Sequence, residues 1–237
     1  MKKIASLLVI FLYFLSCKEE MKPLEFKTLS IENTYAADIE VTFDKAKPNS
    51  DIAKTVNETI ISTILKSIPI SETNNPKTIE EALNSFDEEF KTFKTDFEDS
   101  EQTWTLAIET EVLYKTENII AMGLSVYSDT GGAHGNDSIQ FLNFNPSSGE
   151  LYTYEDLFSD MEGFKKLAES YFLDHMKNEG SEATEFFFGK DFQLPENISF
   201  NEEGVILLYN RYEIASFNQG YTEFVIPIDK AQEFLKF

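Results

Sequence analysis

The chain has 237 residues and carries 42 acidic against 20 basic side chains, which gives a formal net charge of −22. This acidity argues against nucleic acid as a partner and against electrostatic binding to anionic lipid, because both would be repelled and no basic patch offsets the repulsion. It favours a cationic partner, although a strongly negative surface also serves solubility.

The N-terminus has the layout of a secretory signal, which we assign to residues 1–16. Lys2 and Lys3 precede an apolar run that is too short to span a bilayer as a helix. The only cysteine, Cys17, follows directly. This arrangement resembles the lipobox of bacterial lipoproteins, with Phe14 in place of the usual leucine. The resemblance implies that Cys17 becomes the diacylated first residue, so that the protein meets the membrane through its lipid anchor only.

Residues 17–30 lack a persistent pattern and are expected to form a tether. The segment Lys18-Glu19-Glu20 resembles a tag that sends some Gram-negative lipoproteins to the outer face of the outer membrane. It fits equally well the solvated start of a tether. We therefore expect the protein in the cell envelope, lipid-anchored to the outer membrane of a Gram-negative bacterium. Signal removal deletes two lysines and no acid, so the formal charge goes from −22 to −24.

The next part of the chain alternates strand and helix patterns. Alternate apolar residues over 35–43 predict a half-buried strand. Apolar residues at four-residue spacing over 52–64 predict a helix. The Thr78 to Glu81 capping box predicts the start of a second helix. Its apolar stripe is expected to be core: Ile79, Leu83, Phe86, Phe90, Phe93 and Phe97.

A hairpin and a third strand follow. Residues 103–114 and 119–127 predict its two strands, with Trp104 to Tyr114 placing apolar residues on one face and Glu109 and Glu111 on the other. A third strand over 139–144 then ends in a turn cluster.

The remaining elements repeat the mixture of helix and strand. They are a helix capped by Ser159 and Glu162 and ending near Gly180, strands at 198–200, 205–209 and 224–228, and a short terminal helix capped by Asp229. Helices and strands are segregated in blocks, which predicts an α+β fold. We expect antiparallel or mixed sheets with helices packed on one face.

The loop Tyr127 to Asn136 is the first candidate site, because it concentrates three glycines and one of only two histidines after a strand. Glycines in such a loop indicate backbone angles closed to other residues, or close approach of the backbone to something else. His134 is expected to orient the loop or a ligand by hydrogen bonds. The candidate ligand-binding residues here are Tyr127, Thr130, Gly131, Gly132, His134 and Asn136.

A second candidate site directly follows the buried strand at 205–209. Tyr209, Arg211, Tyr212 and Glu213 offer two aromatic rings, a fixed positive charge and a carboxylate. Tyr and Arg are the side chains that most often anchor interfaces. The alternative is that this segment closes a sheet edge, with Arg211 and Glu213 in a structural pair.

Three passages together resemble the extracytoplasmic region shared by the anti-sigma factor RsiV and the peptidoglycan deacetylase PdaC. They are Tyr127 to Asn136 with its Gly131-Gly132-Ala133-His134 core, Asn143 to Phe158, and Gly204 to Pro227 with Tyr209-Asn210-Arg211-Tyr212-Glu213 inside it. The resemblance implies two closely associated subdomains, which we place at residues 31–147 (PdaC-like) and 148–237 (RsiV-like). It also implies lysozyme as a ligand, since the region binds lysozyme in the sigma-factor regulator. This sequence shows neither the sigma-binding segment nor a deacetylase domain, so neither full activity is expected.

No complete catalytic set is visible. His134 and His175 each lack the paired ligands of a zinc site, Cys17 is consumed by lipid, and no serine sits in a Gly-x-Ser-x-Gly elbow. We therefore expect no metal, no cofactor and no catalytic residue.

The leading hypothesis is a non-catalytic envelope lipoprotein that binds a lysozyme-type muramidase as an inhibitor or a sensor. One alternative is peptidoglycan or another glycan, stacked on Tyr127, Tyr209, Tyr212 or Trp104. The other is a glycan hydrolase or esterase that uses His134 with Asp129 or Asp137. The ligand, the membrane face and the oligomeric state are left open by the sequence.

Overall fold

The computed structural model describes residues 24–47, 50–71 and 73–237. The expected signal peptide, Cys17 and the Lys18-Glu19-Glu20 segment lie outside these residues. Within the described ranges, no helix combines the length and the apolar character needed to cross a membrane.

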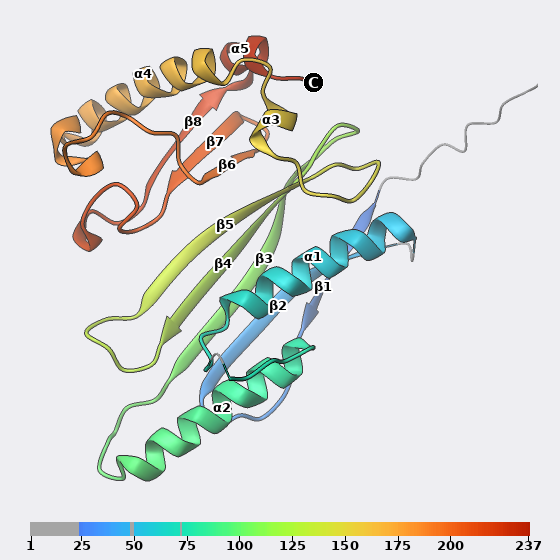
Figure 1. The fold of residues 1–237 in the computed structure, drawn as a ribbon, viewed down its shortest axis with the longest axis vertical. Helices are drawn as coiled ribbons and strands as arrows, with labels where there is room; N and C mark the ends of the chain where they lie inside the picture. The colour runs from blue at the N-terminus through green and yellow to red at the C-terminus, as the bar shows by residue number, and fades with distance from the viewer. Residues whose placement is uncertain (1–23, 48–49, 72) are drawn as a thin grey trace, which may run out of the picture.

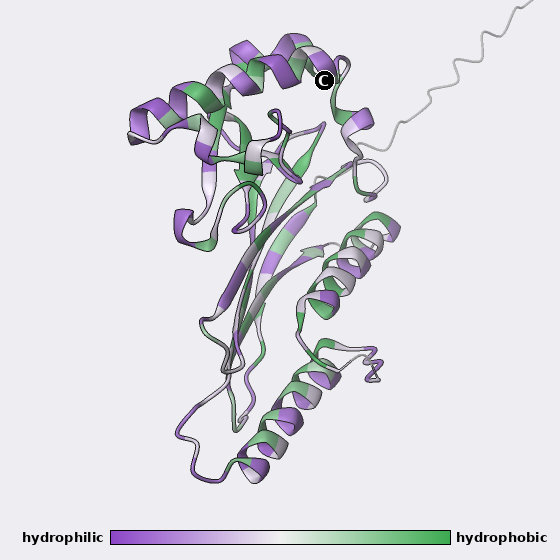
Figure 2. Ribbon diagram, turned by 60° about the vertical axis from the view of Figure 1, so that its left-hand side comes forward, coloured by the Kyte–Doolittle hydropathy of each residue, from purple (hydrophilic) through white to green (hydrophobic). Residues whose placement is uncertain are grey.

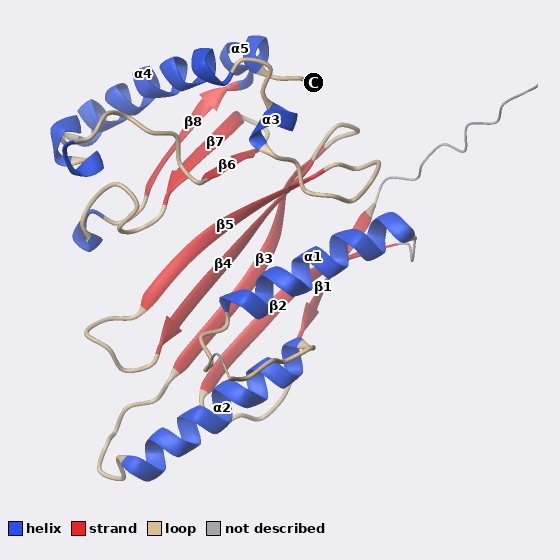
Figure 3. Ribbon diagram, viewed as in Figure 1, coloured by secondary structure: helices blue, strands red, loops and turns tan. Residues whose placement is uncertain are grey.

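A five-stranded sheet forms the larger part of the molecule, in the order β1-β2-β3-β4-β5 (Figure 3). Its strands are β1 (Glu25–Ser30), β2 (Asp38–Lys47), β3 (Thr105–Lys115), β4 (Ile120–Asp129) and β5 (Asn136–Phe144). The β2–β3 pair is parallel and the other pairs are antiparallel, so the sheet is mixed. The parallel pair is possible because a long helical crossover separates its two strands in the sequence.

The tether predicted at residues 17–30 is wrong for residues 25–30. They form β1, which pairs antiparallel with the second half of β2, from Thr42 to Lys47. The sequence of β1 shows no alternation of apolar and polar residues, because the strand lies at the sheet edge and most of its side chains are exposed.

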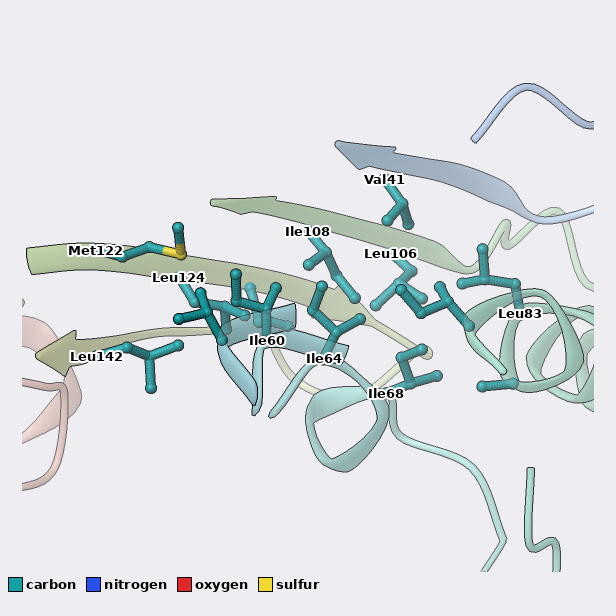
Figure 4. Packing of buried hydrophobic residues seen from close by; sticks show 14 of the residues in the cluster. Val41, Ile60, Ile64, Ile68, Leu83, Leu106, Ile108, Met122, Leu124 and Leu142 are labelled. Carbon is teal, nitrogen blue, oxygen red and sulfur yellow. The ribbon is translucent and has the colours of Figure 1, made fainter. Parts of the chain in front are cut away.

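Helices α1 (Asp51–Ser67) and α2 (Ile79–Asp96) cover one face of this sheet (Figure 1). Ser50 and Thr78 cap them, each accepting a hydrogen bond from the backbone N–H three residues on. Figure 4 shows Ile60 and Ile64 of α1 among side chains from the sheet, such as Ile108. Each such buried aliphatic side chain contributes about 1.5–3 kcal/mol.

The phenylalanine stripe of α2 is core except at its end. Phe86 and Phe90 are buried and pack against Trp104, whereas Phe97, expected in the core, is 59% exposed. Phe97 is the C-cap residue of α2, so the helical spacing that aimed the earlier rings at the sheet no longer applies to it.

Strand β3 also departs from the expected alternation. A register shift between Val112 and Tyr114 interrupts its pairing with β4. Beyond this bulge, Tyr114 packs against the C-terminal core, whereas Leu106 and Ile108 lie in the core under α1 and α2. Tyr114 therefore does not share a face with Leu106 as predicted.

The C-terminal part packs helices on a second, antiparallel sheet of order β6-β7-β8 (Figure 1). Its elements are α3 (Tyr154–Leu157), α4 (Met161–Glu179), β6 (Asn197–Phe200), β7 (Gly204–Tyr209), β8 (Thr222–Pro227) and α5 (Ile228–Ala231). The fold is thus α+β, as predicted. Two predicted caps are wrong: Asp160 caps α4 instead of Ser159, and α5 begins at Ile228 without a side-chain cap.

The C-terminal core extends onto the end of the five-stranded sheet. Ile119 and Ala121, beside the β3–β4 turn, are buried in the C-terminal cluster together with Phe164 and Phe172 of α4. In Figure 2, α1 and α2 lie on one side of the long sheet and the C-terminal part lies over its other side at one end. The rest of that second face is left without a covering helix.

Candidate functional site

The glycine loop is shorter than predicted, because β4 continues to Asp129 and β5 already begins at Asn136. Gly131 adopts φ +94°, and its N–H donates to the Asp129 carboxylate over 2.9 Å. Gly135 lies against the Tyr127 ring, which a β-carbon at position 135 would overlap. Gly132 has no positive φ, and a β-carbon there would meet no atom closer than ordinary contact distance. Two of the three glycines are therefore explained by the loop itself.

The second candidate segment meets this loop in space. The His134 ring stacks on Phe217 of the β7–β8 connection, with centroids 3.8 Å apart and planes inclined by 21°. The Tyr212 hydroxyl lies 3.4 Å from His134 Nε2, and the Tyr212 ring packs beside Phe217 at 5.6 Å. Residues about eighty positions apart thus form one aromatic cluster, which we call the aromatic junction (His134, Tyr212 and Phe217).

The hydrogen bonds of His134 fix its tautomer. Nδ1 is 2.8 Å from the Gly135 carbonyl oxygen, which only accepts, so Nδ1 carries the proton. Nε2 is then the acceptor for the Tyr212 hydroxyl in the neutral ring. Asp129 bonds Gly131 and Asp137 pairs with Arg211, so neither acid orients this imidazole. His134 thus links the loop backbone at Gly135 to the Tyr212 hydroxyl.

Arg211 links the β7–β8 connection to β5. Its Nε lies 2.7 Å from Asp137 Oδ1, and one terminal nitrogen donates to the Phe217 carbonyl over 3.1 Å. The guanidinium also lies over the Phe217 ring, at 4.5 Å, and near the Tyr221 ring, at 5.3 Å. The predicted alternative, an Arg211–Glu213 pair, is wrong, because Arg211 pairs with Asp137.

Tyr221, the residue directly before β8, interacts with the carboxylate of this ion pair. Burial, together with a hydrogen bond to the Asp137 carboxylate and its negative charge, raises the pKa of Tyr221 to about 12. The phenol therefore stays protonated and donates to Asp137 at any physiological pH. Asp137 in turn holds both a tyrosine and an arginine of the C-terminal part.

Two predicted ligand residues are structural. Tyr209 is only 1% exposed, and its hydroxyl donates to the Gln193 carbonyl over 2.6 Å, so its ring cannot reach a ligand. The Glu213 carboxylate accepts from the backbone N–H groups of Glu196 and Asn210, each over 2.8 Å. Burial raises the pKa of Glu213 despite these bonds. Both side chains brace the segment that presents Tyr212.

Tyr212 itself is presented to solvent. Its side chain is 57% exposed, and its backbone adopts φ +67°, a left-handed conformation that is rare for an aromatic residue. Such strain costs about 1–3 kcal/mol and persists only where surrounding contacts impose it, often at binding sites. Here Glu213 and Arg211, on either side of Tyr212 in the sequence, supply those contacts.

The other predicted residues remain at the surface. Tyr127 is 40% exposed, and Thr130, Gly131, Gly132 and Asn136 are exposed around the loop. His175 lies on α4, with its ring 5.9 Å from Phe224 and away from the junction. Across the described part of the chain, no group of three His, Cys, Asp or Glu side chains could hold a metal ion.

Phe217, Asp137 and Tyr221 belong to the site but were not predicted as ligand residues. Asp137 follows the glycine loop by one position, and both aromatic residues lie in the third passage of the family resemblance. Proximity to the motifs could therefore have pointed to these three residues. Their contacts with one another and with Arg211 depend on the tertiary fold and cannot be read from the sequence.

Two family models match adjoining parts of the chain. Deacetylase PdaC matches residues 25–137, and a protein of unknown function (DUF3298) matches residues 155–229. No curated protein matches the sequence. A solved DUF3298 family member from Bacteroides fragilis is 18% identical, with a TM-score of 0.70 over 90% of this chain and 94% of its own. A DUF3298 family protein from Pseudomonas aeruginosa is 21% identical, with a TM-score of 0.66 over 91% and 95%. These likenesses show a common fold.

Proposed function

We propose that this chain, which belongs to the family of paired PdaC-like and DUF3298 regions, is a non-catalytic binding module of the cell envelope. Its ligand is a cationic protein, a lysozyme-type muramidase, which it inhibits or senses. Cys17 carries the lipid that anchors it to the outer membrane. The aromatic junction is the observation that supports this proposal.

The junction has the features of a preformed protein-binding surface. Tyr212 is exposed to solvent, while its hydroxyl contacts His134 and its ring packs beside Phe217. A rigid, exposed aromatic side chain loses little conformational entropy on binding, and tyrosine is enriched among the residues that dominate interface energies. The glycine loop and the β7–β8 connection both contribute residues to this surface, so it forms only where the PdaC-like and DUF3298 regions occur together.

The charge of the protein supports a cationic ligand. A formal charge of −22 over the full sequence attracts a basic enzyme at long range, and salt weakens this attraction. Electrostatic attraction mainly accelerates association, whereas a buried aromatic contact mainly slows dissociation. Tyr212 and the acidic surface would therefore act on different rate constants.

The test is retention of lysozyme by the immobilised mature chain at low and physiological ionic strength, together with the lytic activity of lysozyme in its presence. We expect retention that weakens with salt. Tyr212→Ala should lower the affinity at least about tenfold through faster dissociation. The matched control is Leu173→Ala, which truncates an exposed large side chain on α4, away from the aromatic junction. This variant should bind as the wild type does. No retention by the wild-type chain at low salt would overturn the proposal.

A glycan is the second candidate, favoured by the exposure of Tyr212 and Tyr127. Exposed tyrosine rings can stack on sugar faces, and Tyr209 and the half-buried Trp104 are no longer available for that role. Sedimentation with purified peptidoglycan separates the two ligands. Pelleting that Tyr212→Ala abolishes would select the glycan, and a chain left in the supernatant would reject it.

The anchor has its own test. Metabolic labelling with an alkyne fatty acid should mark the wild-type chain in cells and leave Cys17→Ala unmarked. Protease added to intact cells would then report the membrane face, since only a surface-exposed body is degraded. A wild-type chain without label would remove lipidation from the proposal.

A further inference from the structure

The face of the five-stranded sheet opposite α1 and α2 carries two adjoining hollows of about 500 and 190 Å³. Both are lined by Glu109, Ser125 and Ile139, so they form one groove. Tyr221 closes the larger hollow and Glu223 the smaller one, both from the C-terminal part. We call this feature the sheet groove. Beyond the C-terminal part, no described helix covers this face of the sheet (Figure 2).

The floor of the sheet groove follows from the strand register. Residues that pair across neighbouring strands point to the same face, so the pairings define rows of side chains. One row runs Glu40, Ala107, Tyr127 and Asp137, the next Thr42, Glu109, Ser125 and Ile139, and the third Glu111, Gly123 and Phe141. Small residues thus stand beside the acids, which leaves room above the strands for an inserted side chain.

The sheet groove is negatively charged without internal compensation over most of its length. Glu40, Glu109, Glu111 and Glu223 are exposed, and none of them makes an ion pair within the described residues. None of its lining residues is Lys or Arg. Like charges on adjacent strands repel one another, so this arrangement costs stability unless a cation binds there.

One end of the sheet groove already shows how a cation is held. The Arg211 guanidinium lies against the Asp137 carboxylate at 2.7 Å and over the Tyr221 ring at 5.3 Å. Asp137 and Tyr221 both line the larger hollow. The chain's own arginine therefore pairs with one acid of the sheet groove, whereas Glu40, Glu109 and Glu111 make no ion pair within the described residues.

We propose that the sheet groove is the docking surface for a basic, extended segment of a protein partner. Lysine or arginine side chains of that segment reach Glu40, Glu109 and Glu111 as Arg211 reaches Asp137. The occupant is a basic protein because the uncovered surface is a sheet face lined by several strands, which suits a segment with repeated positive charges. This inference deepens the proposed function, because it adds a second contact surface beside the aromatic junction.

The experiment measures the affinity of a fluorescent deca-arginine peptide and of lysozyme for the mature chain. The groove variant combines Glu40→Gln, Glu109→Gln and Glu111→Gln. The control variant also removes three negative charges, but from the exposed surface of α4, by Glu169→Gln, Asp174→Asn and Glu179→Gln. We expect the groove variant to bind deca-arginine about tenfold more weakly and the control to change by less than about twofold.

Equal weakening by both variants would overturn the inference, because it would assign binding to the overall field of the protein. Thermal unfolding checks that the groove variant folds, and removal of repelling charges should leave its melting temperature equal or higher. Backbone amide shifts induced by deca-arginine give a second readout and should concentrate on β3 and β4.

The outcome for lysozyme separates this inference from the proposed function. If wild-type protein binds deca-arginine through the groove but does not bind lysozyme, the proposed ligand is wrong and the groove stands. If lysozyme binds equally to the wild type and the groove variant but is lost with Tyr212→Ala, the proposed function stands and the groove does not contribute.

Discussion

The side-chain amide of Asn210 makes both hydrogen bonds that a neighbouring strand would give to Ile139. Its nitrogen donates to the Ile139 carbonyl and its oxygen accepts from the Ile139 N–H, each over 2.8 Å. Asn197 accepts from the Phe141 N–H in the same way, and Asn143 donates to the Ile198 carbonyl. Asparagine side chains thus pair with backbone groups along the outer edge of β5 and join it to the C-terminal part. Unpaired backbone groups at an open edge would favour aggregation.

Asn210→Ala tests the weight of this seal. The substitution leaves the two Ile139 backbone groups without partners and is expected to lower the free energy of unfolding by about 1–3 kcal/mol. Urea denaturation followed by circular dichroism measures the change. Asn178→Ala, at an exposed position near the end of α4, should change it by less than about 0.5 kcal/mol. A similar cost for both variants would mean that the amide bridges do not hold the parts together.

The two tyrosines of the second candidate segment should separate stability from binding. Tyr209→Phe removes a buried hydroxyl and leaves the Gln193 carbonyl without that donor, so the free energy of unfolding should fall by about 1–2 kcal/mol. Tyr212→Phe removes an exposed hydroxyl and should cost less than about 0.5 kcal/mol. If the Tyr209 variant instead lost ligand binding at full stability, its assignment to the core would be wrong.

The sequence predicted the class of the fold and both candidate segments, but not their contact. Alternation and capping signals act over a few residues, so they located most strands and helices and missed β1, whose exposed edge carries no such pattern. The aromatic ring of Tyr209 predicts a ligand contact, but β7 is buried on both faces, and a continuous apolar run gives no sign of where burial ends. The Arg211–Asp137 pair joins positions 74 residues apart and depends on how the two sheets pack.

Glu213 makes stability depend on pH in a direction that is unusual for a carboxylate. Burial raises its pKa in the folded state, so the folded protein holds this proton more readily than the unfolded chain. Its contribution is fully present below the ordinary value of 4.5 and is lost as pH rises through the raised pKa. Glu213→Gln cannot titrate, so the stability of the wild type relative to this variant should decline as the pH rises from below 4.5 through the raised pKa of Glu213. A rising difference in urea denaturation would reverse the assignment.

Asp87 should show the opposite dependence. Burial raises its pKa, but hydrogen bonds from Ala37, Lys91 and Ala36 outweigh that effect, and the net pKa lies below its ordinary value of 3.8. Its stabilising contribution is therefore present above pH 3.8 and lost as pH falls through the lowered pKa. Asp87→Ala strands the two backbone N–H groups that now lie 2.6 and 2.8 Å from Oδ1, at a cost of about 2–3 kcal/mol at pH 7. An equal cost at pH 7 and pH 2 would contradict this account.

The glycines of the loop offer a matched pair of alanine substitutions that tests whether the loop shapes the binding surface. A β-carbon at position 135 would overlap the Tyr127 ring, whereas at position 132 it would meet only the His134 carbonyl oxygen at an ordinary 3.7 Å. Because Tyr127 is 40% exposed, it can swing away, so Gly135→Ala should cost less than about 1 kcal/mol of stability. The displaced ring borders the sheet groove, and the backbone at Gly135 holds His134 Nδ1. We therefore expect Gly135→Ala to weaken the binding of lysozyme and deca-arginine several-fold, and Gly132→Ala to leave both unchanged, in the same titrations. Equal affinities for the two variants would place the loop outside the binding surface and make its glycines a matter of folding alone.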